Sequence, residues 1–450
     1  EYVYAKGDFK AAVARYKTVI DKWPKSTLRP HALYGLAWTS LSLKDWAGVE
    51  KTVDRLLAEF PKSELVPRAR YARGTARQQL GKNAEAVGDI QAMLAAKPSA
   101  QDRSDAMYVM GLAQAGLKKH GEAAATFEKL LADNPEYAGS DKTLYELAWS
   151  LKTSGGNNDD KAAARFVELA KRFPKSPLAA EALYHVGENQ YAKKQYAQAA
   201  FNYHASSQKA ADKVLKEKAY HKLGWAYFND GKLDDARQTF DYQRDTFPKG
   251  KLVGDATFML GECLFKMQKH AEALAAFEKV AQTTGKDFAA LALLHGSQSA
   301  AQLKQWEKCR TLAARAAKDF PDSAYLPEML CEQGWALQNL GKPAEAVKLY
   351  ETVLQKTDRE VAARAQFLIG EVFFAAKKYA EAIKTFSKVI YGYSYPRWQA
   401  DATYEAARCF ETMGKNEQAL RYYNELVKRY PKSDKVAVAK KRMEKMSKSQ

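Results

Sequence analysis

The histidines are the side chains best suited to acid–base or metal chemistry near neutral pH, but their spacing supports neither. The seven of them are scattered, and none stands in an H-E-x-x-H pattern or at another metal-ligand spacing on one expected helix. Residues 74–83 come nearest to a phosphate-binding loop, yet Asn83 stands where Ser or Thr is required. Paired acids such as Asp159 and Asp160 fall at expected helix starts, where a carboxylate favourably opposes the helix dipole.

The four cysteines also have a structural explanation. Their spacings contain no C-x-x-C pair, and Cys309 stands in a column of small residues that recurs along the chain. We therefore expect the cysteines to pack as small apolar side chains. With no constellation of catalytic residues, the sequence predicts a protein that is not an enzyme and that holds no metal or cofactor.

Aromatic residues are the remaining candidates, because Tyr and Trp offer apolar area together with a polar group, which suits the anchoring of a peptide. They belong to a pattern that recurs about every 37 residues, with spacings of three and four inside each repeat. Such spacings indicate amphipathic helices and not strands. The pattern is clearest at a small residue, which is found at Ala37, Gly74, Gly111, Ala148, Gly187, Gly224, Gly261, Ser297, Gly334, Gly370 and Ala407.

A second helix follows in each repeat. It carries a small residue such as Ala123 and, four residues later, a bulky one such as Phe127. Pro-Lys-Ser, as at 24–26, then stops this helix, and its Ser is expected to cap the next one. Between the two helices we expect a left-handed C-cap at a Gly or Lys that stands at a fixed distance in sequence from the small residue of the first helix. These residues are Gly7, Lys44, Gly81, Lys118, Gly231, Lys304, Gly341, Lys377 and Gly414.

The columns of small, aromatic and proline residues resemble the tetratricopeptide repeat (TPR) over essentially the whole chain. This resemblance implies an all-α TPR solenoid, a right-handed superhelix of antiparallel helix pairs. The length of the chain, 450 residues, would ordinarily suggest roughly three domains. The repeat instead predicts one continuous array over 1–433, with a leading half-unit at 1–26, about eleven repeats of ~37 residues and an insertion at 155–158. A capping helix is expected over 434–450.

In TPR superhelices the first helix of each pair lines the concave face, and its outward residues are the usual ligand contacts of the family. The resemblance therefore implies an aromatic binding groove without the Lys and Asn clamp of chaperone-binding members. Packing between adjacent repeats would produce the same rows of aromatic residues, and both interpretations remain open. The candidates are Tyr34, Trp38, Tyr71, Tyr108, Tyr145, Trp149, Tyr184, Tyr191, His221, Trp225, Phe228, Phe258, Phe265, Trp335, Phe367, Phe374 and Tyr404.

The charge balance is strongly positive, since 71 Lys and Arg against 53 Asp and Glu give +18. Much of the Lys lies in turns and linkers, and acids are interspersed along every helix, which argues against specific nucleic-acid binding. Residues 435–450 carry a local basic excess. Electrostatic attraction to an anionic polymer or membrane surface is therefore the alternative function. No apolar run approaches the roughly 20 residues that span a bilayer.

Repeats that end in Tyr/Phe-Pro-x-Ser resemble the TPR domains of bacterial envelope proteins of the Tol–Pal-associated YbgF type and of the outer-membrane lipoprotein BamD. This resemblance implies a periplasmic or envelope-associated location, with a cytoplasmic one as the alternative. Glu1 is not an initiating Met, so further sequence is expected upstream, and any signal peptide or anchor would lie there. Together these features predict a non-catalytic scaffold that binds protein or peptide segments in its concave groove.

Overall fold

The protein is built from α-helices. The computed structural model describes residues 1–156, 158–283 and 286–448, and within these ranges no strand occurs. The expected all-α fold of TPR helix pairs is confirmed. Residue 157 of the expected insertion and residues 449–450 of the expected terminal helix lie outside the described residues.

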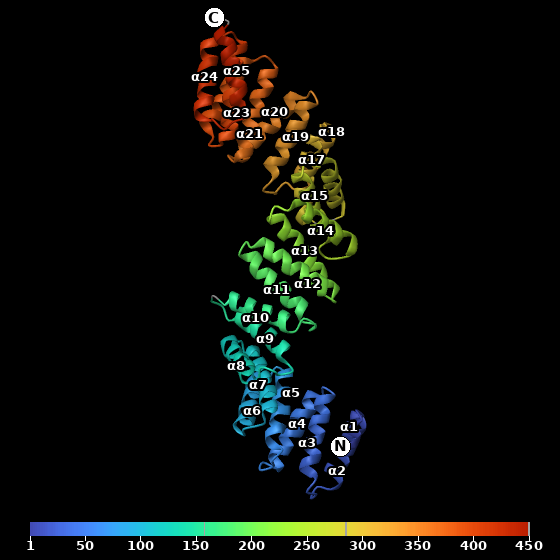
Figure 1. The fold of residues 1–450 in the computed structure, drawn as a ribbon. Helices are drawn as coiled ribbons and strands as arrows, with labels where there is room; N and C mark the ends of the chain where they lie inside the picture. The colour runs from blue at the N-terminus through green and yellow to red at the C-terminus, as the bar shows by residue number, and fades with distance from the viewer. Residues whose placement is uncertain (157, 284–285, 449–450) are drawn as a thin grey trace. The chain divides into compact units, whose positions relative to one another are not determined.

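The chain divides into two compact units, residues 1–226 and 227–450. In each unit the helices follow one another in chain order (Figure 1). One continuous array over 1–433 stays a prediction. The first unit contains α1 (Tyr2–Ala5), α2 (Phe9–Lys22), α3 (Arg29–Ser42), α4 (Trp46–Glu59), α5 (Val66–Gln79), α6 (Asn83–Ala95), α7 (Ala100–Gly116), α8 (His120–Asp133), α9 (Ser140–Thr153), α10 (Asp159–Arg172), α11 (Ala179–Ala192) and α12 (Tyr196–Lys209).

The boundary between the units falls within α13 (Lys213–Asn229). The second unit continues with α14 (Leu233–Thr246), α15 (Val253–Lys266), α16 (His270–Thr283), α17 (Lys286–Gln302), α18 (Trp306–Asp319), α19 (Leu326–Asn339), α20 (Pro343–Lys356), α21 (Glu360–Ala375), α22 (Tyr379–Gly392), α23 (Pro396–Thr412), α24 (Asn416–Arg429) and α25 (Lys435–Lys448).

The odd-numbered helices α1 to α23 are called first helices here, and the even-numbered helices α2 to α24 second helices. Within each unit successive helices pack against one another, as α11 does against α12 and α14 against α15. First helices also contact the next first helix, as α3 does α5 and α17 does α19. The first helices therefore form a layer in which side chains of adjacent repeats meet.

The core is made by the predicted columns. The small residues of the second helices, such as Ala86 and Ala382, are fully buried, as are the aromatic rings that follow them. Each of these rings lies on the small residue of its first helix. A Cβ atom built on Gly187 would come within 2.7 Å of the Tyr203 ring, and one on Gly334 within 2.6 Å of Tyr350. Glycine is needed at these positions because the ring occupies the space of a methyl group.

The turns between paired helices reverse the chain through the left-handed region, as predicted. All nine residues assigned to this role have positive φ, including Lys44 at 58° and Gly81 at 75°. The amide of the residue after Lys44, Asp45, bonds the carbonyl of Ser40 at 2.9 Å, which satisfies a helix-end acceptor. Asp45 then caps α4 by accepting a hydrogen bond from the Gly48 amide at 3.0 Å.

The prediction that the Ser of Pro-Lys-Ser caps the next helix is wrong. The hydroxyl of Ser26 accepts a bond from the amide of Leu28 at 3.1 Å, and Ser63 does the same with Leu65 at 3.3 Å. Leu28 and Leu65 are themselves the N-cap residues of α3 and α5. The hydroxyl therefore shapes the linker before the helix, as an ST-turn does.

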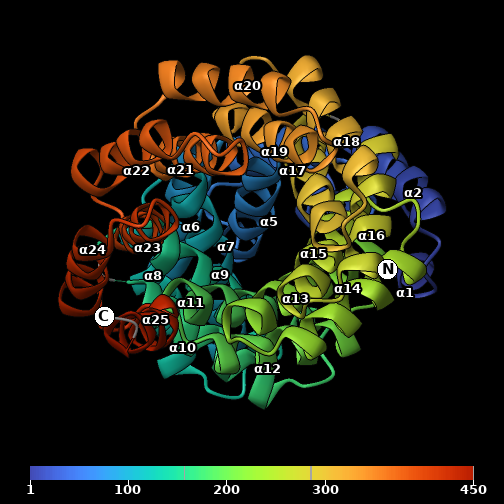
Figure 2. The same cartoon turned by 90° about the horizontal axis from the view of Figure 1, so that it is seen from above.

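The terminal helix α25 packs against α23 and α24 (Figure 2). Ala439 and Met446 are buried in one cluster with Tyr423 and Leu426 of α24. The apolar stripe of α25 is thus covered by the preceding helices, which is the packing that a capping helix requires.

The contact between glycine and ring can be tested with two alanine substitutions in the first unit. We expect Gly187→Ala to destabilise the unit by about 1–3 kcal/mol, because the new methyl group meets the Tyr203 ring. Gly88→Ala is the control: Gly88 is exposed in the middle of α6 with open space around it. Alanine there should stabilise by about 0.5–1 kcal/mol. Urea unfolding followed by circular dichroism measures both, and equal effects would contradict the packing argument.

Candidate functional site

All seventeen predicted binding residues lie on first helices, from Tyr34 to Trp225 in the first unit and from Phe228 to Tyr404 in the second. Their exposure is limited. His221, Phe258, Phe367 and Tyr404 are buried, and the other thirteen are half-buried. Each side chain therefore has a packing role to be separated from any binding role.

The residues three positions before the small column pack inside their own repeat. Six of them place their rings against the core aromatic of the second helix, with ring centroids 5.5–6.0 Å apart. The pairs are Tyr108 with Phe127, Tyr145 with Phe166, Tyr184 with Tyr203, Phe258 with Phe277, Phe367 with Phe386, and Tyr404 with Tyr423. These are packing contacts, so binding by this column stays a prediction.

The tryptophans one position after the small column mostly bridge adjacent first helices. The Trp149 ring on α9 lies 4.7 Å from that of His185 on α11, and the Arg364 guanidinium of α21 lies 5.2 Å from the Trp335 ring of α19. Trp225 instead donates a hydrogen bond to His221 on its own helix at 3.1 Å. Glu262 at the equivalent position pairs with His295 of the next first helix at 2.5 Å. This column thus joins repeats, by ring contacts or by charge.

Three of the four aromatic residues four positions after the small column carry cations on their faces, while Phe265 packs against His270 and His295. Lys222 lies 5.5 Å from the Tyr191 ring, Lys266 lies 5.5 Å from Phe228, and Arg408 lies 4.8 Å from Phe374. In each pair the cation comes from the following first helix of the same unit. Such contacts contribute roughly 0.5–1 kcal/mol each when partly exposed.

Three predicted residues converge on one pocket in the first unit. Tyr34 and Trp38 of α3 and Tyr71 of α5 line a cavity of about 690 Å³, which lies within the size range of ligand sites. The Trp38 ring stacks on Tyr71 at 6.0 Å and 26°, and lies 6.0 Å from Tyr34. The remaining wall is formed by Glu1, Tyr4, Tyr16, His31, Gly35, Leu41, Leu65, Arg68, Met93, Asp102 and Asp105.

The polar groups of this pocket come from α5 and α7. Arg68 donates to Asp102 through Nε at 3.3 Å and Nη2 at 3.0 Å. Asp105 accepts a hydrogen bond from the Tyr137 hydroxyl at 2.9 Å. Burial raises the pKa values of Tyr34 and Tyr71, so both remain neutral donors. The pocket thus combines neutral aromatic walls with carboxylates.

Sequence reasoning missed Arg68, Asp102 and Asp105. Arg68 and Asp105 stand in one column, six residues before the small residue, which is charged in most repeats but varies in sign, so the column does not reveal which charges meet. A weaker signal was present, because Arg68 precedes Tyr71 by three residues and Asp105 precedes Tyr108 by three. Each charge therefore shares a helix face with a predicted aromatic residue.

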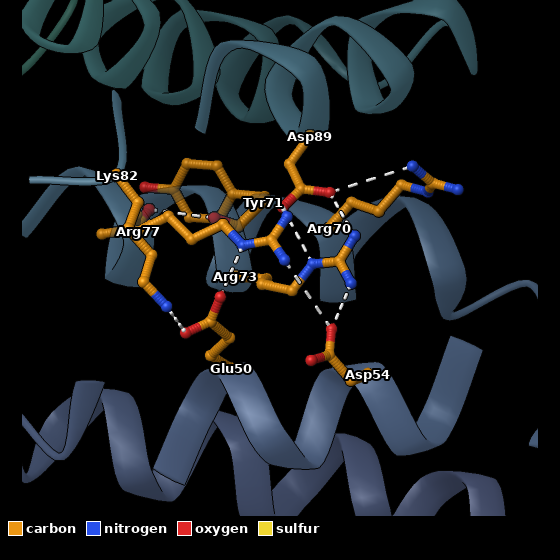
Figure 3. Close-up of polar contacts among 9 residues, drawn as sticks. Glu50, Asp54, Arg70, Tyr71, Arg73, Arg77, Lys82 and Asp89 are labelled. Atoms are coloured by element: carbon orange, nitrogen blue, oxygen red, sulfur yellow. Dashed lines mark hydrogen bonds and ion pairs between the residues drawn. The ribbon is translucent and has the colours of Figure 1, made fainter. Parts of the chain in front are cut away.

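The face of α5 that carries Arg73 and Arg77, away from the pocket, is held in place by an ion-pair network (Figure 3). Asp89 of α6, which is 3% exposed, accepts hydrogen bonds from Arg73 at 2.8 Å and from Arg77 at 2.9 Å. On the other side Glu50 of α4 accepts from Arg77 at 3.0 Å, while Asp54 pairs with Arg73. Arginines of one helix are thus held between carboxylates of its two neighbours. This arrangement fixes the rotation of α5 and with it the position of Tyr71.

A second buried charge lies in the second unit. Burial, reinforced by the nearby carboxylates of Glu405 and Asp401, raises the pKa of Glu371 to about 7. Glu371 lies on α21 in the same column as Trp335. Arg408, which lowers this pKa in part, is itself engaged by Glu405 at 2.8 Å and 2.9 Å.

The cysteines are buried free thiols, and burial raises the pKa of each to about 12. Their predicted role as small packing residues is confirmed. Within the ranges that the structure describes, no three His, Cys, Asp or Glu side chains are grouped to hold a metal ion. None of the described helices combines the length and apolar character needed to cross a bilayer.

Comparisons with known proteins identify the repeat. Three family models, each described as a tetratricopeptide repeat, together match more than half of the chain. One matches residues 71–138, 221–288 and 331–396, a second 3–76, and a third 142–176 and 401–433. A search of curated protein sequences gave no match.

Solved structures with a similar chain path were also found. The crystal structure of the APC/C hetero-tetramer Cut9–Hcn1 matches 98% of this chain and 94% of that chain, with 12% identity and a TM-score of 0.39. A tetratricopeptide repeat protein from Parabacteroides merdae matches 56% of this chain and 93% of that chain, with 16% identity and a TM-score of 0.39.

Two carboxylates that bind the same arginine allow a matched test of the α5 network. We expect Asp89→Ala to lower the stability of α5 and α6 by about 3–5 kcal/mol, because it removes the buried carboxylate that the guanidinium groups of Arg73 and Arg77 share. Asp54→Ala removes a partner of Arg73 whose side chain is 51% exposed, and should cost less than about 1 kcal/mol. Hydrogen exchange of α5 and α6 peptides measures both changes. Similar losses in the two variants would contradict a buried network.

The raised pKa of Glu371 predicts a pH-dependent stability. Between about pH 4.5 and pH 7 the unfolded chain loses the Glu371 proton while the folded chain keeps it, so ionisation costs folding free energy as pH rises. Glu371→Gln should therefore stabilise the second unit at pH 8 by on the order of 2 kcal/mol, and by little at pH 4.5. Thermal unfolding at both pH values measures this difference. Exposed Glu351→Gln controls for the charge change, and a gain independent of pH would contradict the explanation.

Proposed function

The chain belongs to the tetratricopeptide-repeat family, and we propose that it is a non-catalytic scaffold that binds protein or peptide segments on the face formed by its first helices. Proteins of this family generally act as protein-binding scaffolds. A stacked array presents such a face with little cost in ordering, because each helix is already held by its neighbours.

The observation that carries this proposal is the convergence of Tyr34, Trp38 and Tyr71 on a pocket of about 690 Å³. At other repeats, predicted aromatic residues pack against rings of the second helices or against cations of the next repeat. At the pocket their rings leave open space, and aromatic side chains that border such space are the usual anchors of protein interfaces. The aromatic rings that contact Lys or Arg extend the first-helix surface along each unit.

We further propose that the protein works in a bacterial envelope, in the periplasm or associated with the cell envelope. The support for this location is the Tyr/Phe-Pro-x-Ser linker, as at 430–433. A cytoplasmic location is the alternative. Fractionation of the native host separates them, because a periplasmic protein is released by osmotic shock.

Photo-crosslinking tests the binding face. The photoreactive residue p-benzoylphenylalanine would replace Tyr191 on α11 or Phe374 on α21, both half-buried on first helices. The matched controls are Phe201 on α12, which is 73% exposed, and Tyr391 on α22, which is 64% exposed. We expect irradiation in native-host extract to yield discrete protein adducts from the first-helix positions and few from the controls.

Equal adduct patterns at first-helix and second-helix positions, or adducts from the controls alone, would contradict the proposed face. A salt series separates the alternative, an anionic polymer or membrane surface bound by basic edges and α25. Affinity for a polyanion falls by roughly 10³-fold or more between 50 and 200 mM salt when six or more phosphates are contacted. Crosslinking through an aromatic face should change little over the same range.

A further inference from the structure

We propose that the pocket of the first unit binds the cationic side chain of an Arg or Lys residue in a partner protein segment. This inference rests on the proposed function and specifies the chemistry of the partner. It runs against the net charge of +18, which taken alone indicates anionic partners. The pocket is a locally acidic and aromatic site within a basic protein.

The walls of the pocket suit a cation. Tyr34 and Trp38 lie one helical turn apart on α3, and Tyr71 of α5 stacks on Trp38, so the three rings form one continuous aromatic surface. Tyr4 and Tyr16 extend this lining toward α1 and α2. A guanidinium or ammonium group is attracted to the faces of such rings, and Trp is the most effective of them.

The charges of the pocket leave a carboxylate available. Arg68 is offset by Asp102, with which it makes two hydrogen bonds. The bonds described for Asp105 come instead from neutral groups, the Tyr137 hydroxyl and the Gln101 amide. Asp105 therefore contributes a negative charge that no hydrogen-bonded cation offsets. Glu1 adds a second carboxylate to the lining.

The geometry favours a cation that belongs to a protein segment, and disfavours a free small ion. About 690 Å³ is the volume of a site for a drug-sized ligand, larger than one side chain needs. Arg is preferred over Lys, because a planar guanidinium can stack on Trp38 while it bonds a carboxylate.

The test uses the full chain with 5-fluorotryptophan, whose Trp38 ¹⁹F resonance is identified by its loss in Trp38→Phe. Two short peptides are titrated to about 10 mM, identical except for a central Arg or its neutral isostere citrulline. We expect the Arg peptide to shift the Trp38 resonance with at least about tenfold higher affinity than the citrulline peptide. Asp105→Asn should lower the affinity for the Arg peptide about fivefold or more and leave citrulline unchanged.

Two further variants guard against loss of folding. Asp21→Asn removes an exposed carboxylate of α2 outside the pocket and should leave both affinities unchanged. Tyr34→Leu keeps the carboxylates and removes one aromatic wall, so it should weaken binding of the Arg peptide in a chain whose thermal midpoint is retained. Together the two variants separate the roles of charge and ring.

The proposal is overturned if citrulline binds as tightly as Arg, if Asp105→Asn has no effect, or if neither peptide shifts the resonance. Tetramethylammonium binding as tightly as the Arg peptide would also overturn it, since the site would then take a small organic cation. In any of these cases, first-helix crosslinks from Tyr191 and Phe374 would leave the proposed scaffold function intact. If those crosslinks were also absent, the proposed cation site and the proposed scaffold function would both be contradicted.

Discussion

The close contact between the aromatic ring that most second helices carry and a small residue on the paired first helix is the constraint on which the rest of the structure depends. Tyr203 lies so near Gly187, and Tyr350 so near Gly334, that no side chain fits between them. This contact sets how closely the two helices of a pair approach. It thereby also sets how far the first helices of neighbouring pairs can reach toward one another, and which of their side chains meet.

Because first helices of adjacent repeats touch, the surface that could bind a partner is also the surface that joins the repeats. Trp149 is occupied by His185, and Trp335 lies under Arg364. Around Trp38 the neighbour leaves space, and there the same column borders a pocket. Binding in such an array is therefore expected where the repeat departs from its average, and packing where it conforms. The packing interpretation of the aromatic rows is supported by ring contacts at several repeats, and the binding interpretation stays a prediction.

What could be predicted from the sequence was what recurs. The small columns, the core rings and the left-handed turns are fixed by steric rules that act identically in every repeat, so one alignment of the chain with itself reveals them. Arg68 and Asp105 stand in a column whose charge changes sign between repeats, and their meeting with Asp102 depends on the rotation of α5, which Arg73 and Arg77 secure through Asp89. Pairings of that kind follow from side-chain positions in space and leave no periodic trace. Ser26 was misassigned because the linker holds one more turn than the motif suggested.

The turn lysines give the net charge another origin. Six of the seven non-glycine residues at positive φ are lysines, among them Lys118 and Lys304, and each follows the end of a helix. A side chain in this backbone region costs roughly 1–2 kcal/mol, which glycine would avoid. A cation at the negative end of the helix dipole returns about 0.3–1 kcal/mol of that. Six of the 71 basic residues therefore stand where they neutralise helix ends locally, so the net charge alone does not measure the affinity of the chain for a polyanion.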